Sequence, residues 1–287
     1  MKRLISRLLP KSLRPDNAVI PVVRLHGTIM AGGTPMRQNL SLASVAGLLD
    51  KAFSIPAPAV AISVNSPGGS PVQSRLIYKR IRDLAEEKQR PVLVYVEDVA
   101  ASGGYMIACA GDEIIIDPSS IVGSIGVVSA GFGFQELIRK IGVERRVHTS
   151  GRNKAILDSF QPEKEEDIAY LKELQEQIHA VFIELVKSRR GTKLADNDDL
   201  FTGLFWVGAK ALELGLADGI GDMRSDLRRR YGPKTQLRLI SPARGLLSRK
   251  IPLFAAEAPS ADIASSFASG VINAAEEKAA WQRFDLR

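Results

Sequence analysis

The chain has 287 residues, of which 45% are hydrophobic and 25% are charged, and it carries one cysteine and a formal net charge of +7. This length and composition predict an ordinary globular protein with a sizeable core, and they exclude a disordered, collagen-like or coiled-coil chain. With Cys109 as its single cysteine, the chain cannot be stabilised by an intrachain disulfide or by a structural zinc site.

The first segment along the chain, residues 1–17, carries five basic residues and one acidic residue. Arg7 and Pro10 interrupt its apolar positions, so it is too short and too charged to cross a bilayer and lacks the apolar core of a signal peptide. We expect either a solvated end or a basic amphipathic segment in peripheral contact with a membrane surface. With no other long apolar run, the protein is expected to be cytoplasmic or peripheral at the cytoplasmic membrane.

From residue 18 to residue 231 the pattern alternates between short apolar strands and amphipathic helices, which predicts one main domain. Strands are expected at 18–25, 59–64, 91–96, 113–116 and 127–128. Helices are expected at 40–53, 71–88, 102–110, 134–141, 162–190 and 207–215. Strands that are apolar on both faces and separated by helices predict an α/β fold with a mainly parallel sheet covered by helices.

The positive charge is concentrated in a stretch near the C-terminus. Residues 224–250 carry nine basic residues and one acidic residue, whereas residues 18–223 have a net charge of −3. We expect residues 232–287 to be a linker followed by a helical tail over 271–284. Because the basic stretch has almost no aromatic residues between its charges, nucleic acid is not an expected partner, although a non-catalytic scaffold on nucleic acid or membrane stays an alternative.

Two glycine-rich turns directly follow apolar strands, at residues 65–69 (NSPGG) and 100–104 (AASGG). Consecutive glycines permit unusual backbone angles and a close approach of another chain to the main-chain N–H groups. Because ligands bind at the carboxyl edge of parallel sheets, two such turns in successive units predict N–H donors suited to an oxyanion.

Ser102 stands in the second turn at the start of a helix, where a nucleophile or a helix-capping serine is found. The α/β-hydrolase pattern G-x-S-x-G fails at Ala100. A serine nucleophile needs a base, for which the chain offers His26, His148 or, if its pKa is lowered by burial, Lys154. The third histidine, His179, is expected to lie in the long helix as a surface or packing residue.

The order and spacing of several short motifs resemble the signal peptide peptidase A family of serine peptidases, over roughly residues 18–225. The motifs that carry this resemblance are residues 65–69 (NSPGG), 101–105 (ASGGY), 123–127 (GSIGV), 150–154 (SGRNK), 201–203 (FTG) and 211–218 (ALELGLAD). The resemblance implies a Clp/crotonase-like fold, a Ser–Lys dyad without metal or cofactor, and a homo-oligomeric ring that cleaves short, apolar or unfolded peptides such as cleaved signal peptides.

Carried over position by position, the resemblance makes Ser102 the nucleophile and Lys154 the general base. Ser124 would orient the lysine amine, and the N–H groups of Gly69 and Gly103 would bind the oxyanion. The chain departs from the family at Met106 and Leu204, and we expect it to lack the N-terminal anchor that many members carry. An acyl hydrolase of the same fold that uses His148 or His26 as its base is the alternative.

Overall fold

The computed structural model describes residues 18–34, 37–241, 278–279 and 281–284, so the N-terminal segment 1–17 lies outside the described residues. Its main sheet has the strand order β10-β1-β4-β5-β6-β9, and β7 pairs with both β5 and β8. The strands are β1 (Val19–His26), β4 (Val60–Ser66), β5 (Val92–Ala101), β6 (Glu113–Ile116), β7 (Ile121–Gly123), β8 (Phe205–Val207), β9 (Gly219–Ile220) and β10 (Gln236–Leu239). Every pairing in this sheet is parallel except β7 with β8, so the predicted α/β class is confirmed.

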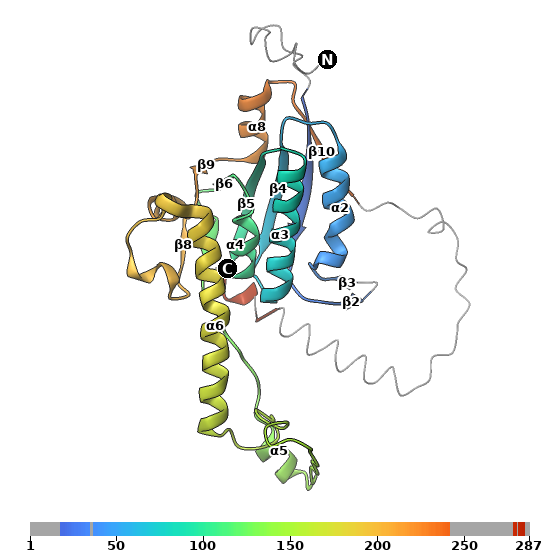
Figure 1. Ribbon diagram of the computed structural model, residues 1–287, viewed down its shortest axis with the longest axis vertical. Coiled ribbons are helices and arrows are strands. Elements are labelled where there is room, and N and C mark those ends of the chain that lie inside the picture. The colour runs from blue at the N-terminus through green and yellow to red at the C-terminus, as the bar shows by residue number, and fades with distance from the viewer. Residues whose placement is uncertain (1–17, 35–36, 242–277, 280, 285–287) are drawn as a thin grey trace, which may run out of the picture.

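Helices α2 (Leu42–Ser54), α3 (Pro71–Glu87) and α4 (Gly103–Ala108) follow strands of the sheet and cover one of its faces (Figure 1). Local sequence explains where α3 begins, because Ser70 accepts a hydrogen bond from the Gln73 backbone N–H and Pro71 occupies the first turn. The remaining helices are α5 (Gln135–Lys140), α6 (Glu165–Arg190), α7 (Gly208–Glu213) and α8 (Met223–Tyr231). None of the described helices is long and apolar enough to cross a membrane.

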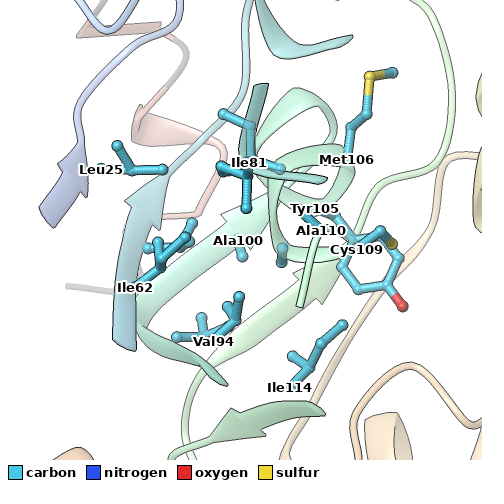
Figure 2. Close-up of a cluster of buried hydrophobic side chains, with 14 of the residues drawn as sticks. Leu25, Ile62, Ile81, Val94, Ala100, Tyr105, Met106, Cys109, Ala110 and Ile114 are labelled. Atoms are coloured by element: carbon cyan, nitrogen blue, oxygen red, sulfur yellow. The ribbon is translucent and has the colours of Figure 1, made fainter. Parts of the chain in front are cut away.

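The largest hydrophobic cluster lies between the sheet and these helices. Alternate residues of the strands point into it, among them Ile62 and Val94, which are fully buried (Figure 2). Helix α4 adds Tyr105, and Cys109 at its C-terminal end also belongs to the cluster, so the helix that follows Ser102 is embedded in the core. Cys109 is fully buried, and this burial raises the pKa of its thiol to about 12.

The opposite face of the sheet is partly covered by α8, which overlaps the start of the basic stretch at residues 224–250. Leu227 of α8 packs into a second apolar cluster with the strands, and the Tyr95 hydroxyl donates a 2.7 Å hydrogen bond to Asp226. Arg230 forms hydrogen-bonded ion pairs with Glu113 and Asp226. The start of the basic stretch is therefore docked on the sheet, through the apolar side chains of Met223, Leu227 and Tyr231 and through this ion-pair network.

Strand β10 lies beyond the expected domain boundary at residue 231. It pairs with β1 in parallel, from Val19 opposite Gln236 to Val22 opposite Leu239, and forms one end of the sheet. The linker interpretation was wrong for these residues, whose sequence lacks the long apolar run of the central strands because an edge strand is only half covered. Of the helix expected over 271–284, residues 278–279 and 281–282 are helical, and Trp281 and Phe284 pack near Ala101.

Residues 127–164 and the first half of α6 form an arm that projects from the body, with α5 at its far end (Figure 1). One expectation fails here, because residues 127–128 are not a strand and the strand of this region is β7 at Ile121–Gly123. Val128 is instead exposed on the arm, as are Val143 and Val147.

Candidate active site

Ser102 occupies the turn between the buried strand β5 and helix α4. Its backbone angles, φ 51° and ψ −122°, lie in a region that costs a non-glycine residue about 1–3 kcal/mol. Although it stands at the N-cap position, its hydroxyl makes no capping hydrogen bond, and its backbone N–H donates to Gly123 O at 2.8 Å. A strained turn thus presents a half-buried hydroxyl that the helix does not use.

The turn at residues 65–69 packs directly on the Ser102 turn. A Cβ on Gly68 would lie 2.8 Å from Ser102 Cβ and 2.9 Å from Gly103 N, and one on Gly104 would lie 2.5 Å from Ser66 O. Because these contacts join backbone to backbone, no side chain fits between the two turns. This contact explains why both turns are rich in glycine, and it brings the ends of β4 and β5 to one place.

Among the described residues, none accepts a hydrogen bond from the backbone N–H of Gly69 or of Gly103. The backbone of Ile29 makes hydrogen bonds to the two residues that flank Gly69. The Ile29 N–H donates to Gly68 O at 2.8 Å, and Ile29 O accepts from the Ser70 N–H at 2.7 Å. In such a parallel bridge the N–H of the intervening residue, Gly69, points away from Ile29. Gly103 is the first residue of α4 and therefore has no intrahelical acceptor. Two unused N–H groups beside a serine are what an oxyanion hole requires.

The third part of the site is the turn at residues 123–126, which follows β7. Gly123 O accepts from the Ser102 backbone N–H, and Ser124 N–H donates to Leu204 O at 2.7 Å. Ser124 is 4% exposed and has a φ of 52°, so it too is held in a strained conformation. Within the part of the chain that the structure describes, the Ser124 hydroxyl makes no hydrogen bond. The structure thus brings Gly69, Ser102, Gly103 and Ser124 together.

Lys154 lies on the arm and not beside Ser102. Its loop belongs to the far end of α6, because Leu157 N–H donates to Asp167 in the first turn of that helix. The helix next contacts the body through His179, fourteen residues after Glu165 and thus about 21 Å further along at 1.5 Å per residue. The lysine side chain is exposed and makes no ion pair with any described residue. Within one chain, the predicted base is therefore separated from the predicted nucleophile.

None of the three histidines stands as a base beside Ser102. Nε2 of His26 lies 2.7 Å from Ser63 Oγ and its Nδ1 lies 3.3 Å from a guanidinium nitrogen of Arg24, so both ring nitrogens are engaged. Burial lowers the pKa of His26, an effect that the nearby Glu97 partly opposes. His148 is exposed on the arm.

His179 was expected to be a surface or packing residue, and the structure gives it a specific contact. Its Nε2 lies 3.0 Å from Ile125 O, in the turn that carries Ser124. No local pattern marks this contact, because the two residues are 54 positions apart. Among the described residues, no group of three histidine, cysteine or acidic side chains is placed to hold a metal ion.

Comparison with known proteins identifies related sequences. The family model described as peptidase family S49 matches residues 85–231, which include Ser102, Ser124 and Lys154. The chain is 36% identical over 208 residues to Protease 4 of Haemophilus influenzae, covering 70% of this chain and 32% of that protein. It is 30% identical over 209 residues to the chloroplastic serine protease SPPA of Arabidopsis thaliana, covering 71% of this chain and 31% of that protein.

A third relative matches over almost the whole chain. A Brucella abortus protein named Na(+)/H(+) antiporter NhaA is 64% identical over 287 residues, which cover 99% of this chain and 39% of that protein. The chain thus spans about two fifths of the length of this relative, and about a third of the length of the two proteases.

Proposed function

This chain belongs to peptidase family S49, and we propose that it is a serine endopeptidase in which Ser102 is the nucleophile and Lys154 the general base. The observation that carries the proposal is the strained Ser102, whose unused hydroxyl stands beside the free N–H groups of Gly69 and Gly103. Strain of this kind persists only where the surroundings over-determine it, and it concentrates at active sites.

The chemistry assigned to these groups balances over one cycle. A neutral Lys154 amine takes the Ser102 proton as Oγ attacks the scissile carbonyl, and the N–H groups of Gly69 and Gly103 bind the oxyanion. The lysine then gives that proton to the leaving amine as the C–N bond breaks, which leaves an acyl ester on Ser102. Water attacks this ester, the lysine accepts its proton, and the proton returns to Ser102 as the acid product departs.

A lysine serves as a base near neutral pH only after burial has removed water from its amine. Because Lys154 is exposed within one chain, we assign its burial to a neighbouring copy on which the arm docks, with the Ser124 hydroxyl positioned to accept from the amine. The same docking would place the lysine of one copy beside Ser102 of another, in a homo-oligomeric ring.

Exposed apolar side chains on the arm support this docking. Tyr170, Leu174, Ile178 and Val181 recur at the spacing of one helix face along α6, and each is at least 37% exposed. Further exposed apolar residues lie on the arm before α6, namely Val128, Phe132, Leu137, Ile141 and Val143. Contiguous apolar surface of this kind marks protein–protein interfaces.

Short, apolar or unfolded peptides, such as cleaved signal peptides, are the proposed substrates. The antiporter name of the Brucella relative describes a membrane protein, and a region 64% identical to this chain forms part of it. That relation supports a peptidase acting close to a membrane, either from the cytoplasm or in peripheral contact through residues 1–17.

Two single variants and their mixture test the proposal. Ser102→Ala and Lys154→Ala are each expected to lower kcat for a peptide or ester substrate by about a thousandfold or more. His148→Ala is the control, because it removes an exposed histidine side chain from the same arm and leaves the proposed dyad intact. This variant is expected to keep wild-type turnover. Full activity of either dyad variant refutes the dyad, and loss of activity in His148→Ala alone favours the histidine base.

The mixture separates a shared site from a site within one chain. If neighbouring copies supply Ser102 and Lys154, dissociating and reassembling equal amounts of the two inactive variants restores a competent pair in about a quarter of the sites. If one chain supplies both residues, the reassembled mixture stays inactive. The oligomer mass, measured by light scattering, shows whether reassembly has taken place.

A further inference from the structure

We propose that His179 is a positioning residue of the active site, whose imidazole fixes the turn at residues 123–126 relative to the arm helix α6. This inference rests on the proposed function of Ser102 and Ser124. It adds a residue that takes no part in the chemical steps and acts through the turn that it holds.

The turn at residues 123–126 controls two groups of the site at once. Gly123 O accepts from the backbone N–H of Ser102, and the next residue is Ser124. A shift of this turn therefore moves the anchor of the nucleophile and the proposed partner of the lysine amine together. Since catalysis requires placement of these groups to well under 1 Å, whatever holds the turn affects turnover.

The backbone of this turn is held from two sides. On one side, Ser124 N–H donates to Leu204 O, just before strand β8. On the other side, Nε2 of His179 lies 3.0 Å from Ile125 O, and because a carbonyl only accepts, the imidazole donates. Among the described residues, His179 makes the only side-chain hydrogen bond to the backbone of residues 123–126. Ile125 is fully buried, so its carbonyl has no ready replacement partner in water.

The helix that carries His179 is itself anchored to the body beyond this point. Phe182 and Val186 are buried in the main core, and Arg189 donates hydrogen bonds of 2.9 Å to Cys109 O and to Gly111 O, at the end of α4. Helix α6 thus contacts both the turn that carries Ser124 and the far end of the nucleophile helix. His179 stands at the last of these contacts before α6 enters the arm, so the imidazole links the arm that carries Lys154 to the nucleophile.

Three variants separate positioning from stability. His179→Phe keeps an aromatic ring but removes the donor, and His179→Gln keeps an N–H donor of similar reach. Val186→Ala opens a cavity in the same helix without touching Ile125 O, which makes it the matched control for lost stability. For each full-length variant, the measurements are Tm, kcat and KM with a peptide substrate, and the rate at which a fluorophosphonate labels Ser102.

We expect His179→Phe to lower kcat and the labelling rate by about tenfold, the effect of losing one well-placed hydrogen bond, with KM changed by less than about twofold. His179→Gln should restore most of the loss, and Val186→Ala should lower Tm with kcat kept. The inference is refuted if His179→Phe keeps wild-type kcat, if His179→Gln loses as much as His179→Phe, or if Val186→Ala loses kcat to the same extent.

Failure of the inference is distinguishable from failure of the proposed function. If Ser102→Ala abolishes turnover and labelling while His179→Phe behaves as wild type, the dyad stands and only the positioning role falls. If Ser102→Ala keeps its activity, the proposed function itself is wrong, whatever the histidine variants do.

Discussion

Replacing Gly68 by alanine probes the contact between the two glycine-rich turns, and Gly27 provides a matched control. The two glycines have nearly the same backbone angle, with φ of +102° at Gly68 and +107° at Gly27. A Cβ on Gly27 meets nothing within 4 Å, whereas one on Gly68 lies within 2.9 Å of Ser102 Cβ, Ala101 O and Gly103 N. The pair of variants therefore separates the cost of the backbone angle from the cost of the contact.

The magnitudes follow from these two costs. A positive φ costs alanine about 1–2 kcal/mol at either position, and the reduced freedom of the unfolded chain offsets part of this equally in both. At Gly68 the new methyl group also presses on backbone atoms that cannot rotate away, which adds about 1–3 kcal/mol. Gly68→Ala should therefore destabilise the protein by about 1–3 kcal/mol more than Gly27→Ala.

Urea denaturation of both full-length variants measures the free energies of unfolding, and the rate of fluorophosphonate labelling reports on Ser102. Gly27→Ala is expected to label at the wild-type rate, and Gly68→Ala at least about tenfold more slowly, because its methyl group displaces the serine turn. Equal destabilisation and equal labelling in the two variants would contradict the close packing of the two turns.

Three further predictions concern the core beneath the site. Burial by itself raises the pKa of the Asp218 carboxyl, but hydrogen bonds from Arg190 and Lys193 outweigh this effect and lower the pKa. The ionised carboxylate therefore stabilises the fold above a pH of about 4, and this stabilisation is lost as the pH falls further. In urea denaturation, the destabilisation caused by Asp218→Asn should accordingly be larger at pH 7 than at pH 3, and a pH-independent difference would refute the ion pair. Cys109 should react with a thiol reagent only as fast as the protein unfolds, because the thiol is fully buried and its pKa is about 12; rapid native-state labelling would contradict its place in the core. Tyr105→Phe removes a 2.9 Å hydrogen bond to the buried Leu216 O and should cost about 1–3 kcal/mol in unfolding free energy, a loss that would be absent if water reached that carbonyl.

Much of the central sheet was predictable because its signals are local. The runs at residues 59–64 and 91–96 are apolar at every position except Ser63, a pattern typical of a strand covered on both faces, and they became β4 and β5. The glycines of residues 65–69 and 100–104 marked the turns that follow these strands. Peripheral elements were missed where the signal was weak. Strand β10 is an edge strand with alternating polar residues, and α8 docks through Met223, Leu227 and Tyr231 within an otherwise strongly charged sequence.

The sequence by itself determined the fold class and the serine turn, because each depends on residues that are neighbours along the chain. Only the tertiary structure decided how these parts meet. It set Gly68 against Ser102, and it placed Lys154 on an arm away from that serine. It also joined His179 to Ile125 across 54 positions. Such contacts depend on the packing of whole elements, and no local pattern of hydrophobicity or turn residues encodes them.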